Sequence, residues 1–64
     1  MVQILKSTAT VSGAEILEIA VDSSSDLPTT TSLTGHIIAM GSIAWDISTG
    51  NFYGMTGDGT WVAQ

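Results

Sequence analysis

The chain contains no cysteine, although it is only 64 residues long. A domain of this size buries only about 60% of the surface of its unfolded chain, so small domains commonly depend on disulfides, a structural metal or oligomerisation. Without cysteine, disulfides and thiolate zinc sites are excluded, and the single histidine, His36, excludes a cluster of histidine ligands. Association with further copies or docking on a larger partner therefore becomes the leading expectation.

The charge balance excludes two classes of partner. Lys6 is the only basic side chain against six acidic residues, and the formal net charge is -5. Nucleic-acid binding requires several lysines or arginines to neutralise phosphates, and an anionic membrane surface repels an acidic chain. We therefore expect no nucleic-acid and no membrane partner. No pattern of a signal peptide is visible, and the sequence from Met1 to Gln64 reads as a complete small reading frame.

Serine and threonine dominate the polar residues, with 17 of them against 7 charged residues. A hydrophobic content of 44% predicts a folded chain, and a composition poor in charge and punctuated by glycine favours strands over helices. We therefore predict an all-β fold with a small antiparallel sheet. Residues 1–64 form a single small domain, in which 1–34 are a looser, extended N-terminal arm and loop and 35–64 are the compact β part.

The N-terminal part has weak patterns. Residues 2–6 alternate as a short strand would, and 7–13 resemble a turn or an extended linker. Residues 22–34 form the longest irregular stretch, in which serines and aspartates initiate turns and Pro28 disfavours helix before it. This stretch is either a loop or crossover, with one short helical turn at 24–27, or an exposed arm.

Residues 14–21 are compatible with a strand or a helix. A strand would place Leu17, Ile19 and Val21 on one face, whereas a helix could begin at Ser12 with a capping box. The segment is short for a helix and contains β-branched residues, so the strand is favoured.

Residues 42–63 carry the clearest strand pattern. Ile43, Trp45 and Ile47 alternate with smaller or more polar residues, at the period of two that strands have. Gly50 can supply the positive φ of a hairpin turn, and a second glycine-rich turn follows the return strand. We predict a C-terminal three-stranded antiparallel meander over these residues.

One spacing imitates a calcium loop. Asp22, Ser24 and Asp26 have the spacing of the first three ligands of an EF-hand. The sixth and twelfth positions should then be Gly and Glu, but they are Leu27 and Leu33. A solvated turn is therefore the favoured interpretation, and we expect no metal.

No catalytic constellation is complete. His36 could lie near Ser42 or Ser32, but a strained nucleophile turn such as G-x-S-x-G is missing. Asp46 and Asp58 lie in different elements, without a cleft for a pair of catalytic carboxyls. We therefore expect a non-enzymatic protein without a cofactor.

The aromatic residues Trp45, Phe52, Tyr53 and Trp61 are the remaining candidates for binding. Adjacent strands could set several of them side by side, as in platforms that bind sugars or protein surfaces. The favoured interpretation is that the tryptophans belong to the core of a small sheet or to a subunit contact. A ligand platform is the alternative.

Two segments carry a resemblance to a known class of protein. VDSSSDLP and GSIAWDISTGNFYGMTGDGTWVAQ resemble small virion structural proteins of tailed bacteriophages, over about residues 21–64. The matching positions are Asp22, Ser23, Asp26, Leu27, Pro28, Gly41, Ser42, Ala44, Thr49, Gly50, Tyr53, Gly59 and Trp61. Residues 1–20 match no motif of that class.

The resemblance implies a structural role in the virion, often as a homotrimer attached to the capsid. The chain is too short for a long fibre shaft, so a capsid decoration (cement) protein or a head-fibre base is expected. It would be made in the bacterial host cytoplasm and reside on the capsid exterior, with the major capsid protein or another virion protein as partner. The alternative is a small carbohydrate-binding module of a phage adsorption apparatus or tail-associated protein, using Trp45, Tyr53 and Trp61.

The apolar residues exceed what a small sheet can bury, which indicates an interface. Open edges of the sheet could also accept a partner strand. The candidate interface residues are Leu27, Leu33, Ile37, Ile38, Met40, Trp45, Tyr53 and Trp61.

Overall fold

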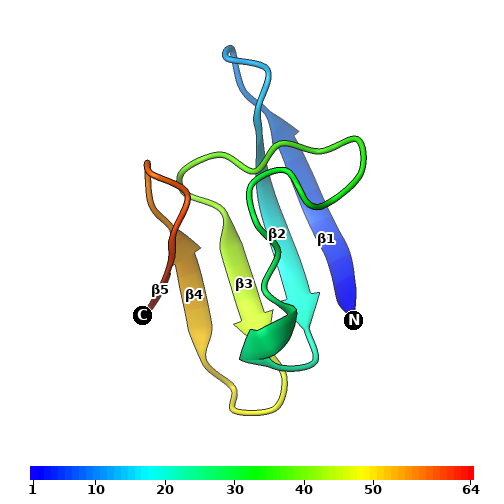
Figure 1. Cartoon of the computed structure of the whole chain (residues 1–64), viewed down its shortest axis with the longest axis vertical. Helices are drawn as coiled ribbons and strands as arrows, with labels where there is room; N and C mark the ends of the chain where they lie inside the picture. Colours follow the sequence, from blue (N-terminus) through cyan, green and yellow to red (C-terminus); the bar gives the residue numbers. More distant parts are fainter.

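Five strands form one sheet in the order in which they occur along the chain (Figure 1). The computed structural model describes residues 1–64. The strands are β1 (Val2–Ala9), β2 (Glu15–Val21), β3 (Ile43–Asp46), β4 (Phe52–Met55) and β5 (Trp61–Ala63). A single 3-10 turn, η1 (Ser24–Asp26), is the only helical element. The predicted all-β fold is confirmed.

β1 and β2 form an antiparallel hairpin that includes most of the region expected to be a loose arm. The hairpin turns at Gly13, which has a φ of 88°, and the register changes between Ile4 and Lys6 at a bulge. The prediction of an extended arm over residues 1–34 is therefore wrong for its first two-thirds. The alternation of residues 2–6 indicates only part of β1, because β1 is an edge strand whose side chains are almost all exposed and carry little hydrophobic pattern.

The structure assigns residues 15–21 to β2, which confirms the strand over the helix. Leu17, Ile19 and Val21 are buried on one face of the sheet, whereas Ile16 and Glu18 are exposed on the other. Successive side chains point to opposite faces of a strand, so this alternation of burial shows which face of β2 is covered.

β2 and β3 pair in parallel, so the sheet is mixed and not purely antiparallel as predicted. Parallel neighbours require a long crossover connection, which residues 22–42 supply. We call this segment the connection. It contains η1, in agreement with the short helical turn expected at 24–27, and it runs in front of the sheet in Figure 1.

β3, β4 and β5 are consecutive antiparallel neighbours. The β3–β4 turn contains Gly50, with a φ of 76°, whose N–H donates to the Asp46 carbonyl at 2.8 Å. The β4–β5 turn contains Gly59, with a φ of 89°. Residues that have a side chain rarely adopt a positive φ, so glycine suits both turns.

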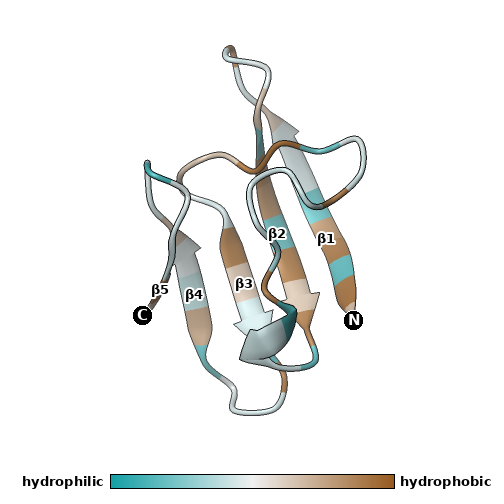
Figure 2. Ribbon diagram, viewed as in Figure 1, coloured by the Kyte–Doolittle hydropathy of each residue, from teal (hydrophilic) through white to brown (hydrophobic).

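The core lies between the connection and one face of the sheet. Figure 2 shows that β2 is mostly apolar, with polar bands between its apolar stretches, so apolar residues lie on both faces of this strand. The buried apolar residues are Leu17, Ile19, Val21, Ile38, Ala44 and Met55, and Val2, Leu27, Leu33, Tyr53 and Trp61 pack against them. Only nine residues in the chain are buried, so each core side chain carries a large share of the stability.

β3 buries its smaller side chains and exposes its larger ones. Ser42, just before the strand, and Ala44 are fully buried and Asp46 is 1% exposed, whereas Ile43 and Trp45 are 45% and 42% exposed. This is the reverse of the usual arrangement, in which large apolar residues face the core. The face that carries Ile43 and Trp45 is consequently an unusual surface for a monomeric domain.

Candidate functional site

The candidate site is the face of the sheet that the connection leaves uncovered, which we call the open face. Strand register places its residues in rows that cross β2, β3, β4 and β5. The open face consists of Ile16, Glu18, Ala20, Ile43, Trp45, Ile47, Phe52, Gly54 and Val62. Most of these residues are apolar, so the open face is an apolar surface supported by backbone that the sheet holds rigid.

Two aromatic rings lie at the centre of the open face. Trp45 and Phe52 are directly opposite each other across β3 and β4, and their rings stack with centroids 6.3 Å apart and an interplanar angle of 11°. Phe52 is 49% exposed and Val62 on β5 is 46% exposed. Cross-strand aromatic pairs stabilise a sheet, but here they also present a flat apolar surface to the surroundings.

The open face has almost no charge. Glu18 is its only charged residue, and the only lysine, Lys6, lies opposite it in the register of β1 and β2. The other five acidic residues, Glu15, Asp22, Asp26, Asp46 and Asp58, lie outside the open face. The negative charge of the chain is thus concentrated elsewhere on the molecule.

Two buried polar side chains fix the covered face of β3. Ser42 Oγ accepts a hydrogen bond from the Leu17 N–H at 3.0 Å and donates one to the Ala39 carbonyl at 2.8 Å. Asp46 Oδ1 accepts hydrogen bonds from the N–H and the hydroxyl of Ser48, at 3.0 and 2.7 Å. The hydrogen bonds from Ser48 lower the pKa of Asp46. Because both side chains are satisfied, they are tolerated in positions that apolar residues usually occupy.

Glu15, His36 and Ser7 form the main polar cluster. His36 Nδ1 lies 2.6 Å from Glu15 Oε2, and the Ser7 hydroxyl donates to Glu15 Oε1 at 2.6 Å. Both groups contact the same carboxylate, so the serine and the histidine are not arranged as a nucleophile and its base. The other serines considered as partners of His36 are engaged elsewhere, Ser42 with Leu17 and Ser32 with Thr29. The cluster ties the connection to β1 and β2.

This cluster predicts loss of stability in acid. The hydrogen bond from Ser7 and then that from His36 lower the pKa of Glu15 below its ordinary value of 4.5. The folded state therefore binds fewer protons than the unfolded state in this range, and the stabilisation is present above pH 4.5 and lost as the pH falls through the folded-state pKa. In thermal unfolding from pH 7 to pH 2, Glu15→Gln should lose stability less steeply than the wild type. Ser7→Ala should fall between them, and parallel curves for all three would contradict the assignment.

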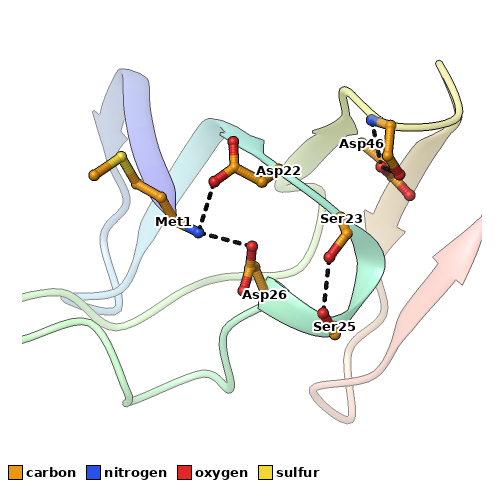
Figure 3. A network of polar contacts seen from close by, with 7 residues as sticks. Met1, Asp22, Ser23, Ser25, Asp26 and Asp46 are labelled. Atoms are coloured by element: carbon orange, nitrogen blue, oxygen red, sulfur yellow. Dashed lines mark hydrogen bonds and ion pairs between the residues drawn. The ribbon is translucent and has the colours of Figure 1, made fainter.

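The amino terminus is held by two aspartates (Figure 3). The Met1 ammonium lies 2.7 Å from Asp26 Oδ2 and 3.1 Å from Asp22 Oδ2. The hydrogen bond to Asp26, followed by that to Asp22, raises the pKa of the Met1 amino group above its ordinary value of 8.0. The aspartates with EF-hand-like spacing thus bind the start of β1. No group of three His, Cys, Asp or Glu side chains is placed to hold a metal ion.

The structure divides the eight predicted interface residues into two groups. Ile38 is buried, and Leu27, Leu33, Tyr53 and Trp61 pack against the core. Ile37 and Met40 on the connection and Trp45 on the open face are exposed. Most of the predicted set therefore serves the core of this chain, and only Trp45 belongs to the open face.

The aromatic residues considered as an alternative ligand platform are also divided between the two faces. Trp45 and Phe52 share the open face, whereas Tyr53 and Trp61 pack on the covered face, where Trp61 Nε1 donates to the Pro28 carbonyl at 2.7 Å. The prediction missed Ile16 and Val62. Alternate residues of a strand share a face, so Ile16 could have been grouped with the other outward residues of β2, and Val62 with those of β5. That grouping identifies the open face only when the other face is known to be covered.

Neither a pocket nor a membrane-crossing helix is found. The surface has no pocket, and no helix has the length and the apolar character needed to cross a membrane. Comparisons of the chain with protein-family models, with curated proteins and with solved structures found no match.

Proposed function

We propose that the chain is a non-enzymatic structural protein of a tailed-bacteriophage virion. It binds the exterior of the capsid as a decoration (cement) or head-fibre-base subunit and acts as a homotrimer. Its partners are further copies of the chain and the major capsid protein or another virion protein. The resemblance of residues 21–64 is the reason for naming the phage virion, and the structure supports a role in binding.

Several residues that carry the resemblance have structural roles in this fold. Gly41, Gly50 and Gly59 have φ values of 94°, 76° and 89°, which favour glycine. Ser42 joins the connection to β2, and Trp61 joins β5 to the connection. These residues shape turns and join elements of this fold, so the positions that carry the resemblance are ones on which this small β fold depends.

The observation that carries the binding role is the open face. Its centre exposes Ile43, Trp45, Phe52 and Val62, each by more than two-fifths. Contiguous apolar patches on soluble proteins commonly mark interaction sites, and the small core leaves the chain dependent on further burial. Assembly into a layer of copies on a capsid makes use of both properties, because contacts within that layer cover such a patch without any catalytic group.

Capsid binding tests this proposal directly. Expanded capsids assembled from the major capsid protein of the same particle would be incubated with the purified chain and sedimented. We expect saturable co-sedimentation with a fixed number of copies per capsid subunit, and cryo-electron microscopy should show added density on the exterior. A chain that remains in the supernatant at every concentration, and is absent from purified virions by mass spectrometry, would refute the proposal.

Carbohydrate binding is the second candidate, favoured by the exposed stack of Trp45 and Phe52. Titration of the chain with bacterial surface glycans, followed by tryptophan fluorescence, tests it. If the stack binds a sugar, Trp45→Ala should abolish the response. Phe52→Ala should weaken it, and Tyr53→Phe, on the other face, should leave it unchanged. No response across a panel of glycans would leave only the structural role.

A further inference from the structure

We propose that the open face is the contact between copies of this chain, which pack sheet against sheet and cover Trp45 and Phe52. The inference rests on the proposed function for the expectation that copies associate, and it adds which surface they use. It assigns the capsid contact to a different part of the molecule.

The area of the open face suits such a contact. The chain measures 33 × 20 × 17 Å, and the sheet lies across the two longer dimensions (Figure 1). The whole side of the molecule that carries the open face therefore has a projected area of at most roughly 660 Å², which is of the order of the ~800 Å² of accessible surface that each partner buries in a stable complex. An interface of ~800 Å² would cover about a fifth of the chain's total surface of 3932 Å². A stable contact between copies would therefore occupy the whole open face.

The distribution of charge favours an identical copy as the occupant. Two chains with a net charge of -5 repel each other, and the repulsion is smallest where the surfaces that meet are neutral. The open face is such a surface, because its only charge, Glu18, lies beside the only lysine, Lys6. In a contact between copies, Glu18 of one copy can approach Lys6 of another. A partner selected for positive charge would instead bind where the other acidic residues lie.

The burial of small residues and exposure of large ones along β3 gives an independent reason to expect a contact between copies on the open face. Ala44 contributes almost no apolar area to the core, whereas Ile43 and Trp45 on the other face contribute large side chains. Sheets that pack face to face interdigitate large side chains from both inner faces, with the sheets about 10 Å apart. Neighbouring copies whose open faces turn toward one another would supply such a layer, and β3 would then have apolar contacts on both faces.

The test compares one charged substitution on the open face with one elsewhere. Trp45→Asp places a carboxylate at the centre of the face, and Met40→Asp places the same charge on an exposed apolar residue of the connection. In analytical ultracentrifugation at about 100 μM, we expect the wild type and Met40→Asp to have the mass of three copies, as the proposed homotrimer requires. Trp45→Asp should have the mass of one copy, which corresponds to an apparent dissociation constant at least tenfold larger. Circular dichroism confirms that each variant is folded.

A second variant covers failure of Trp45→Asp to fold. Val62→Lys charges the open face at the middle of β5, and it should also shift the mass to one copy. In a Trp61→Phe background, acrylamide quenching of Trp45 should decrease as the wild-type open face associates. A wild-type mass of one copy at this concentration, or an oligomeric mass that neither Trp45→Asp nor Val62→Lys lowers, would overturn the inference.

Capsid sedimentation separates this inference from the proposed function. If Trp45→Asp has the mass of one copy and still binds capsids, the result supports the open face as the contact between copies. Trp45→Asp that keeps its oligomeric mass but loses capsid binding would show that the face contacts the lattice, and it would overturn the inference while the proposed function stands. Association through the open face, without capsid binding and with the chain absent from purified virions, would support the inference and refute the virion role.

Discussion

Leu17→Ala should lower the free energy of unfolding by about 2–5 kcal/mol, the cost of a large-to-small change in a packed core. Leu17 is fully buried in β2, and the core contains only six buried apolar residues. A domain of this length has roughly 3–10 kcal/mol of stability in total. The variant is therefore expected to be largely unfolded at 37 °C, as measured by far-ultraviolet circular dichroism and urea titration.

Ile16→Ala is the matched control for Leu17→Ala. Ile16 is the preceding residue of the same strand, lies on the open face and is 37% exposed, so at low protein concentration its truncation should cost about 1 kcal/mol or less. As the protein concentration rises and the open face is covered, the cost of Ile16→Ala should increase, whereas that of Leu17→Ala should not. Equal losses at low concentration would contradict the assignment of the covered face.

The sequence predicted where the strands lie better than it predicted which face of each strand is covered. The alternation of residues 42–47 indicates a strand, but it describes two faces and does not say which one is covered. The size of Ile43 and Trp45 would favour burying them, and the structure instead buries Ser42, Ala44 and Asp46. The choice depends on the connection, which crosses one face only, and no local pattern encodes the path of such an irregular segment.

The candidate interface shows the same limitation. Leu27 and Leu33 were the conspicuous apolar residues of an irregular stretch, which suggested exposure, yet they pack against the core. Tyr53 and Phe52 are adjacent in sequence, and strand geometry requires them to lie on opposite faces. The sequence therefore identified the aromatic residues of the sheet. Only the register of β3 and β4 places Phe52 on the open face and Tyr53 against the core.

Ser42→Ala should lower the free energy of unfolding by about 1–3 kcal/mol, although it removes a single oxygen atom. Ser42 is fully buried. Its hydroxyl is the hydrogen-bond acceptor for the Leu17 N–H and a donor to the Ala39 carbonyl. Alanine leaves the Leu17 N–H without its partner in a buried place, whereas the Ala39 carbonyl still accepts a hydrogen bond from the Ser42 N–H at 3.3 Å. An unsatisfied buried group costs more than the bond contributes.

Ser24→Ala provides the control for Ser42→Ala, because Ser24 is exposed on η1 and its hydroxyl makes no hydrogen bond with the protein. Its effect should be within about 0.5 kcal/mol. Amide hydrogen exchange locates the defect, because the Leu17 N–H should exchange faster in Ser42→Ala than in Ser24→Ala, even when both are compared at equal global stability. If Leu17 remained equally protected, the hydroxyl would not be its partner, and the connection would have to be held against β2 by the Glu15–His36 contact and by the packing of Ile38 instead.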